Sequence, residues 1–226
     1  IVKRSLDARK KPQLFYVYMV DVTIPEEEER KVLKRCHNNQ IQKIEPVKYE
    51  FPVKHYEGTE RPVIVGMGPA GLFCGYVLAK AGFRPILLER GKCVEERSRD
   101  VEAFWETGRL NTESNVQFGE GGAGTFSDGK LTTRIKDPRA HKVIELLHRF
   151  GAPEEITVMA KPHIGTDILK EIVRSMREKI LALGGEVRFG TKVTDLLIED
   201  GRMKGLVLNG EEELPAEHVV LALGHS

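Results

Sequence analysis

The sequence predicts an α/β fold in which a parallel sheet is combined with an antiparallel β-meander, and a small α+β module precedes it. Two observations predict this fold. Residues 62–91 read as an apolar strand, a glycine-rich turn, a helix and a second short apolar strand, which is the pattern of a βαβ unit. Residues 193–223 read as short strands separated by glycine-containing turns, without a helix, and this pattern is typical of a meander.

Residues 1–58 are expected to form the small α+β module. Residues 14–24 alternate into β-branched and aromatic types, which indicates a strand. Pro25 and the four glutamates after it open a helix that runs to about His37. A further extended segment is expected at 41–51.

The four glutamates at 26–29 stand at the N-terminal end of this helix. There they complement the positive end of the helix dipole, so we expect no metal site. Residues 52–61 contain Pro52 and Gly58 and read as a linker to the larger domain, which is expected at 59–226.

A cluster of basic residues lies near the N-terminus. It could meet a phosphate or RNA, but no stacking aromatic residues are interleaved with it, so we interpret it as a solvated basic segment. The cluster consists of Lys3, Arg4, Arg9, Lys10 and Lys11.

The glycines of the βαβ unit predict a Rossmann-type dinucleotide site. Gly66 permits the tight turn after the strand, Gly68 lets a pyrophosphate approach the backbone, and Gly71 lets the helix pack close to the sheet. Pro69, followed by Ala70, stands where the helix begins, and it lacks an N–H that would be unpaired there anyway. The helix dipole then favours an anion at this position.

The second strand of the unit carries the predicted ribose contact. The helix should stop at Gly82, and residues 86–88 are a short apolar run, as expected for a strand buried on both faces. Glu89, followed by Arg90, ends this strand. A carboxylate there can accept hydrogen bonds from both ribose hydroxyls of an adenosine, and it repels a 2′-phosphate, which argues against NADP. FAD and NAD both remain open.

A second glycine-rich segment follows a highly charged helical stretch at 94–105. Five glycines occur within residues 119–129, and such a segment exposes consecutive backbone N–H groups and passes close to a flat or anionic ligand. Neighbouring polar residues add donors and charge that a flexible surface loop does not need. These are Thr125, Ser127, Asp128 and Lys130.

Two crossover helices are expected next. Residues 139–150 place four apolar side chains on one face, and a longer helix, capped by Thr166 or Asp167 and ended by Gly184 and Gly185, does the same. The apolar positions are Val143, Leu146, Leu147 and Phe150 in the first helix and Ile168, Ile172, Met176, Ile180 and Leu183 in the second.

The meander discriminates between the two cofactors. Its turns are expected at Asp200-Gly201 and Asn209-Gly210. A doubly wound NAD domain would continue with alternating strands and helices, whereas FAD domains of the glutathione-reductase kind insert a meander before they return to the parallel sheet. The returning strand, 219–223, would end at Gly224, where the backbone must pass the nucleotide. We therefore expect FAD.

Composition excludes several other classes of protein. The formal net charge of the 226 residues is +1, so no global field indicates nucleic acid or an anionic membrane. No apolar run approaches the roughly 20 residues of a spanning helix, and no signal-peptide core follows the N-terminus, so we expect a cytoplasmic protein. The three cysteines, Cys36, Cys74 and Cys93, form no Cys-x-x-Cys pair, which argues against a disulfide framework, a zinc site and a dithiol flavoenzyme. We expect Cys74 to be a core residue.

Four segments resemble a family of bacterial proteins described as uncharacterised FAD-dependent dehydrogenases, within the glutathione-reductase-like NAD(P)/FAD-dependent oxidoreductases. The likeness covers nearly the whole chain, and the long glycine string is its most specific part. The segments are Ser5 to Lys11, Asn115 to Lys130, Lys161 to Asp167 and Leu223 to Ser226.

The resemblance implies a FAD-dependent oxidoreductase and assigns roles to several residues. Gly66, Gly68 and Gly71 would hold the pyrophosphate, Glu89 the adenosine ribose, and the backbone of Val193 would face the adenine. A further run would lie along the pyrophosphate or the flavin. This run consists of Gly121, Gly122, Ala123, Gly124 and Thr125.

The resemblance assigns no acid or base. His163, Asp128 and Lys130 are candidates only, and a histidine in such a turn is more often structural. The implied partner is a small-molecule substrate or an electron carrier such as NAD(P)H. We expect no membrane partner, and a nucleic acid is the less favoured partner. Family members continue into a further domain, so these residues would be a fragment whose FAD domain is incomplete at its C-terminal end.

A second hypothesis belongs to another class. The nucleotide would serve as a structural or sensing ligand, while the N-terminal module binds a partner such as RNA. The basic cluster at residues 3–11 is the feature that favours this hypothesis.

Overall fold

The computed structural model describes residues 1–36, 39–45, 49–52, 55–126 and 137–224. Several predicted features therefore lie outside the described residues. They are the polar residue Ser127, the candidates Asp128 and Lys130, the helix end at His37, and the last two residues of the chain.

A parallel sheet of four short strands forms the middle layer of the larger domain, in the order β5-β4-β3-β9. Val63 pairs with Ile86 on one side and with Val219 on the other. The strand at Glu186–Arg188 was not predicted, because three residues with charged ends give little apolar signal. The strands are β3 Val63–Val65, β4 Ile86–Leu88, β5 Glu186–Arg188 and β9 Val219–Leu221.

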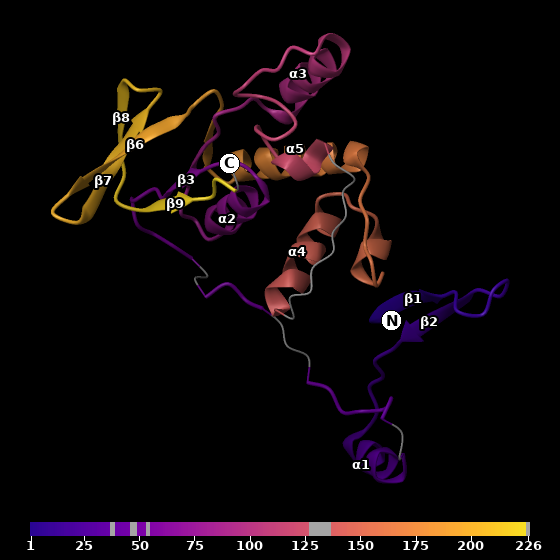
Figure 1. The fold of residues 1–226 in the computed structure, drawn as a ribbon. Coiled ribbons are helices and arrows are strands. Elements are labelled where there is room, and N and C mark those ends of the chain that lie inside the picture. The colour runs from indigo at the N-terminus through magenta and orange to yellow at the C-terminus, as the bar shows by residue number, and fades with distance from the viewer. Residues whose placement is uncertain (37–38, 46–48, 53–54, 127–136, 225–226) are drawn as a thin grey trace.

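The two faces of this sheet contact different layers, since alternate residues of a strand point to opposite faces. Ile64 and Leu87 belong to a core with helices α2 (Pro69–Lys80) and α5 (Thr166–Ala182). Val63, Val65, Ile86 and Leu88 pack instead on Leu206, Leu208 and Ala216. Figure 1 shows the three layers, with the meander in gold at the left and α5 on the other side of β3 and β9.

The meander is antiparallel, in the order β6-β7-β8. Its strands are β6 Val193–Glu199, β7 Arg202–Leu208 and β8 Glu212–Pro215. Asp200 and Gly201 have φ values of 48° and 73°, and Asn209 and Gly210 have 53° and 84°. Two successive positive φ values are typical of type I′ hairpin turns. The predicted α/β fold with a parallel sheet, a meander and a returning strand is therefore confirmed.

The connection from β4 to β5 carries helices α3 (Val94–Thr107), α4 (Pro138–Arg149) and α5. Asp137 caps α4 by accepting a hydrogen bond from Arg139 N. The predicted cap of α5 is wrong by one or two residues: Gly165 is the N-cap, while Thr166 and Asp167 lie in the first turn. The predicted inward positions Ile172, Met176 and Ile180 are fully buried.

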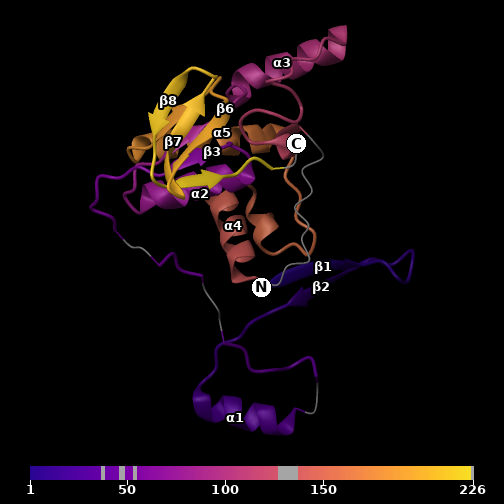
Figure 2. The ribbon, with the colours of Figure 1, turned by 60° about the vertical axis from the view of Figure 1, so that its left-hand side comes forward.

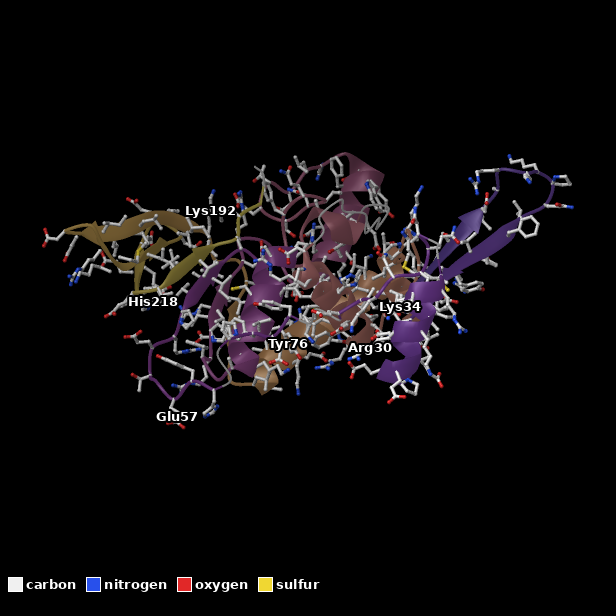
Figure 3. All side chains as sticks on the ribbon, turned by 90° about the horizontal axis from the view of Figure 1, so that it is seen from below. Arg30, Lys34, Glu57, Tyr76, Lys192 and His218 are labelled. Carbon is white, nitrogen blue, oxygen red and sulfur yellow. The ribbon has the colours of Figure 1, made fainter. Side chains whose placement is uncertain are left out.

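The N-terminal residues form a hairpin and a helix. Strand β1 (Lys3–Asp7) pairs antiparallel with β2 (Phe15–Met19), and α1 spans Glu26–Arg35. Figures 1 and 2 show α1 far from the parallel sheet, and Figure 3 labels its exposed residues Arg30 and Lys34. The segment at 41–51 was expected to be extended, but its described residues form no strand.

The hairpin corrects the expectation that the basic cluster has no aromatic residues beside it. Lys3 and Arg4 of the cluster lie in strand β1, and the pairing brings aromatic side chains next to them from β2. The guanidinium carbon of Arg4 lies 5.4 Å from the ring centroid of Tyr16, and the ring of Tyr18 lies 6.3 Å from that of Tyr16. In the described part of the chain, no helix is long and apolar enough to cross a membrane.

Candidate nucleotide-binding site

A cavity of about 360 Å³ opens at the carboxyl ends of β3, β4 and β9. Ligands of open α/β sheets bind outside the carboxyl ends of the strands, at the point where the strand order reverses. The volume is within the range of small-molecule sites. The lining residues are Val65, Gly66, Gly68, Pro69, Ala70, Leu88, Glu89, Arg90, Gln117, Phe118, Gly119, Gly122, Ala123, Thr191, Lys192, Val193, Ala222, Leu223 and Gly224.

Gly66 and Gly71 are required by the packing of the protein itself. Gly66 has a φ of 100°, and a Cβ there would lie 2.5 Å from the carbonyl oxygen of Ala222. A Cβ on Gly71 would lie 1.9 Å from the carbonyl oxygen of Gly66. The tight turn and the close approach of helix to strand are therefore both present as predicted.

Gly68 differs from these two glycines. Among the described residues, a Cβ there would come within 4 Å of the Cα of Gly122 alone, at 3.9 Å, which is ordinary contact. Gly68 lines the cavity, so a side chain at this position would occupy the space open to a ligand. This arrangement fits a ligand group that approaches the backbone, as a pyrophosphate does.

The N-terminus of α2 faces the same cavity. Gly68 is its N-cap, Pro69 occupies the first turn, and no side chain of the described residues caps the helix. Its first N–H groups and the positive end of its dipole are thus available to an anion. The predicted role of Pro69 and Ala70 as part of a phosphate site fits this geometry.

Glu89 is held in the cavity wall by two main-chain donors. One carboxylate oxygen accepts a hydrogen bond from Met67 N at 2.8 Å, and the other accepts one from Gly91 N at 2.9 Å. The side chain is 5% exposed. Each oxygen has a further lone pair, so the carboxylate can still accept from ribose hydroxyls.

Part of the second glycine segment forms the opposite wall. Gly121 N donates to the carbonyl of Met67 at 2.8 Å, which joins this segment to the first. Gly119, Gly122 and Ala123 line the cavity, but Gly121, Gly124 and Thr125 do not. Only some of the predicted run is therefore brought to the site.

The buried guanidinium of Arg97 fixes the shape of this segment. Arg97 is 0% exposed and donates to the carbonyls of five residues: Asn115, Val116, Gly119, Glu120 and Gly122. Burial lowers the pKa of Arg97 to about 10, so the side chain is still charged at neutral pH. Positively charged donors make stronger hydrogen bonds than neutral ones.

Sequence reasoning missed Arg97, although a signal was present. Val94, Arg97 and Val101 are the buried residues of α3, and their spacing places them on one helical face. An arginine on an otherwise apolar face indicates a residue with buried partners.

Glu120 connects the same segment to two helices. One oxygen accepts from Val94 N and from Arg177, both at 2.7 Å, while the other has no partner among the described residues. Burial raises the pKa of Glu120 to about 7, although both donors favour the carboxylate. Arg177 also binds Glu95 at 2.6 Å and, by its hydrogen bonds, holds the pKa of Glu95 at about 2.

Two more segments close the cavity. Thr191 N donates to the carbonyl of Glu89 at 2.9 Å, which places Val193 in the wall. Ala222 N donates to Val65 O at 2.8 Å, which brings Gly224 there.

His163 is exposed and lies outside the lining, so the structure does not bring it to the site. Cys74 is partly buried against the main core, as predicted, and burial raises its pKa.

Comparisons with known proteins follow this geometry. No family model matches the chain. A protein of Clostridium beijerinckii, described only as uncharacterized, is 48% identical over 230 residues. The match covers 100% of this chain and 42% of that protein, so the chain spans less than half the length of its curated relative.

Several solved structures are similar to part of this chain. THI4 of Thermovibrio ammonificans has a TM-score of 0.46 at 24% identity, over 74% of this chain and 58% of that one. Glycine oxidase of Bacillus cereus has a TM-score of 0.45 at 13% identity, over 71% and 56%. OTEMO, solved in complex with FAD and NADP, has a TM-score of 0.45 at 17% identity, over 73% and 25%.

Proposed function

We propose that this chain carries the part of a FAD-dependent, dehydrogenase-like oxidoreductase that binds the ADP half of the cofactor. The supporting observation is the cavity in which the open N-terminus of α2, the carboxylate of Glu89 and the second glycine segment meet. In this proposal residues 59–226 belong to the FAD-binding domain, and residues 1–58 are a separate module.

The chain's residues would bind and orient the nucleotide. Gly68 and the first turn of α2 would hold the pyrophosphate, Glu89 would accept hydrogen bonds from the ribose, and the backbone of Val193 would face the adenine. Gly122 and Ala123 would lie on the opposite side of the pyrophosphate. Gly66 and Gly71 would act indirectly, by shaping the turn.

The meander favours FAD over NAD, because it stands between β5 and β9 where a doubly wound NAD domain continues with helices. FAD would supply the hydride or electron transfer, and the protein would supply binding, orientation and charge. An electron carrier or NAD(P)H would be the partner, and the substrate would be a small molecule.

Binding of ADP and FAD to this chain tests the proposal directly. Gly68→Ala should weaken binding by about tenfold or more, because the new methyl group occupies the space of the pyrophosphate. Gly124→Ala is the matched control: among the described residues, no atom lies within 4 Å of a Cβ built there, and Gly124 is not among the residues that line the cavity. Isothermal titration calorimetry measures both.

The whole protein provides a second measurement. We expect a yellow protein whose flavin absorbance is bleached by dithionite or NAD(P)H. A protein that binds neither ADP nor FAD would contradict the proposal, as would equal losses in the Gly68 and Gly124 variants.

The hairpin supports a second candidate, in which the nucleotide is a structural or sensing ligand and the N-terminal module contacts RNA. Tyr16 and Tyr18 are 62% and 49% exposed, and Arg4 lies beside Tyr16. Exposed aromatic rings next to cations can stack on bases of single strands.

Single-stranded RNA binding by this chain at increasing salt tests that candidate. Binding should weaken steeply with salt and should be lost in a Tyr16→Ala and Tyr18→Ala double variant. Trp105→Ala is the control, since Trp105 is 64% exposed on α3. No binding at low salt would contradict the candidate.

A further inference from the structure

Three charged side chains meet at the mouth of the cavity, and the proposed function gives them no role. The Nε and Nη2 atoms of Arg90 donate to one oxygen of Glu113, at 2.8 and 2.6 Å. Lys192 Nζ lies 3.4 Å from the other oxygen of Glu113. Arg90 and Lys192 line the cavity beside Glu89, and Lys192 is labelled in Figure 3 at the start of the meander.

Main-chain contacts hold the three segments that carry these side chains. Gly190 N donates to Gly91 O at 3.0 Å, and Thr191 N donates to Glu89 O at 2.9 Å. The carbonyl of Glu113 packs against Gly91, where an added Cβ would lie 2.9 Å from it. The meeting of the three charges is therefore a property of the backbone.

Arg90 stays at the cavity for a second reason. Its guanidinium carbon lies 4.2 Å from the centroid of the Phe118 ring, a cation–π contact that does not involve Glu113. Removing the Glu113 charge would thus leave Arg90 in the cavity wall.

Without Glu113, the two cations would form a phosphate site. A guanidinium and an ammonium side by side are suited to bind the oxygens of a phosphate monoester. This pair stands next to Glu89, the residue placed at the adenosine ribose, where a 2′-phosphate would project. Glu113 accepts hydrogen bonds from Nε and Nη2 of Arg90 and from Nζ of Lys192. Burial raises the pKa of Glu113, but Arg90 and Lys192 outweigh this and lower it below its usual value, so the carboxylate stays charged.

We propose that Glu113 is a specificity-determining residue that makes this site select adenosine with a free 2′-hydroxyl over 2′-phosphorylated adenosine. It does so by neutralising Arg90 and Lys192, and together with Glu89 it leaves no net positive charge for a second phosphate. This inference rests on the proposed nucleotide site.

Two probes that differ only in the 2′-phosphate, ADP-ribose and 2′-phospho-ADP-ribose, test the inference by calorimetry. The wild-type chain should bind ADP-ribose more tightly. Glu113→Gln should reduce this preference by about tenfold, mainly through tighter binding of the phosphorylated probe, because charge-assisted hydrogen bonds to Arg90 and Lys192 become available. Adding Lys192→Met to Glu113→Gln should restore part of the preference.

Glu186→Gln is the matched control. Glu186 also binds two arginines, Arg61 at 2.9 Å and Arg188 at 2.7 Å, and it does not line the cavity. This variant removes the same charge and should keep the wild-type preference.

The outcomes separate the inference from the proposed function. If Glu113→Gln binds ADP-ribose as the wild type does and its preference is unchanged, the inference is overturned while the nucleotide site stands. An equal change in the Glu186 variant also overturns it, since net charge alone would then explain the effect. If neither probe binds the wild-type chain, the proposed site fails and the inference fails with it.

Discussion

The two glycine segments that meet at the cavity are built in different ways. Residues 66–71 take their shape from their own sequence, because a strand ends, Gly66 turns with a φ of 100°, and α2 begins. Residues 119–124 depend on Arg97, which is more than twenty positions earlier and binds the segment's carbonyls from α3. One wall of the site is thus set by local sterics and the other by buried charge, and the two should fail for different reasons.

Replacement of Arg97 should have the largest effect. Arg97→Met removes the side-chain donor of five carbonyls, of which those of Gly119 and Gly122 keep a main-chain donor. Each buried carbonyl left without a donor costs about 1–3 kcal/mol. Arg97→Lys should recover little, since an ammonium has three donors and no planar fork. Urea unfolding measures the stability, and ADP binding measures the site.

Arg99→Met is the control for Arg97, because Arg99 is exposed on the same helix. It should change the free energy of unfolding by less than about 0.5 kcal/mol. If Arg97→Met were equally mild, the second wall would not depend on the buried guanidinium, and the contrast between the two segments would disappear.

Gly71→Ala should be the next largest change and should act on the first wall alone. The new Cβ would lie 1.9 Å from the carbonyl oxygen of Gly66, so β3 and α2 must separate. We expect a loss of roughly 1–3 kcal/mol in the free energy of unfolding. Gly68→Ala should cost less than about 1 kcal/mol, since no protein atom is displaced. Equal stability losses at the two positions would contradict this difference.

The same difference explains what the sequence could predict. The strand, Gly66, Gly71, Pro69 and α2 were predicted because each follows from neighbours in the chain. The turns of the meander were predicted for the same reason, since two adjacent residues determine them. The segment at 119–124 was predicted to be at the site from its glycines, but glycine content does not tell which residues face the ligand.

Long-range partners account for what was missed. Arg97 and Glu120 have their roles only through contacts between α3, the glycine segment and α5. Strand β1 was missed because its residues are mostly polar and its partner strand supplies the aromatic rings. In these cases the deciding interaction joins residues far apart in the sequence.

Glu120 should make the stability of the second wall depend on pH. Its pKa is raised from 4.5 to about 7 by burial, so the folded protein holds a proton that the unfolded chain has already lost. The stabilising contribution is therefore full below about pH 4.5 and is lost as the pH rises through about 7. The pKa of Glu95 is lowered from 4.5 to about 2, so Glu95 changes the stability only at more acidic pH.

Urea unfolding at pH 5 and pH 8 checks this dependence. Relative to Glu120→Gln, the wild type should lose of the order of 1–3 kcal/mol between these two values. Glu96→Gln, at an exposed position of α3, should follow the wild-type profile. Parallel profiles for wild type and Glu120→Gln would show that Arg177 and Val94 N keep Glu120 charged throughout.

Thr125→Val should have the smallest effect on stability and binding. It tests what the side chains of the second wall contribute. Thr125 is 0% exposed, and its hydroxyl has no partner among the described residues. Valine has nearly the same shape, so the free energy of unfolding should be unchanged or higher by less than about 1 kcal/mol. Because Thr125 lies outside the cavity lining, ADP binding should also be unchanged, in contrast to Gly68→Ala. A marked loss of nucleotide binding in this variant would show instead that the hydroxyl reaches the ligand, as the resemblance of the glycine string implies. The wall would then be held by Arg97 but would bind through its side chains, rather than through its backbone as the first wall does.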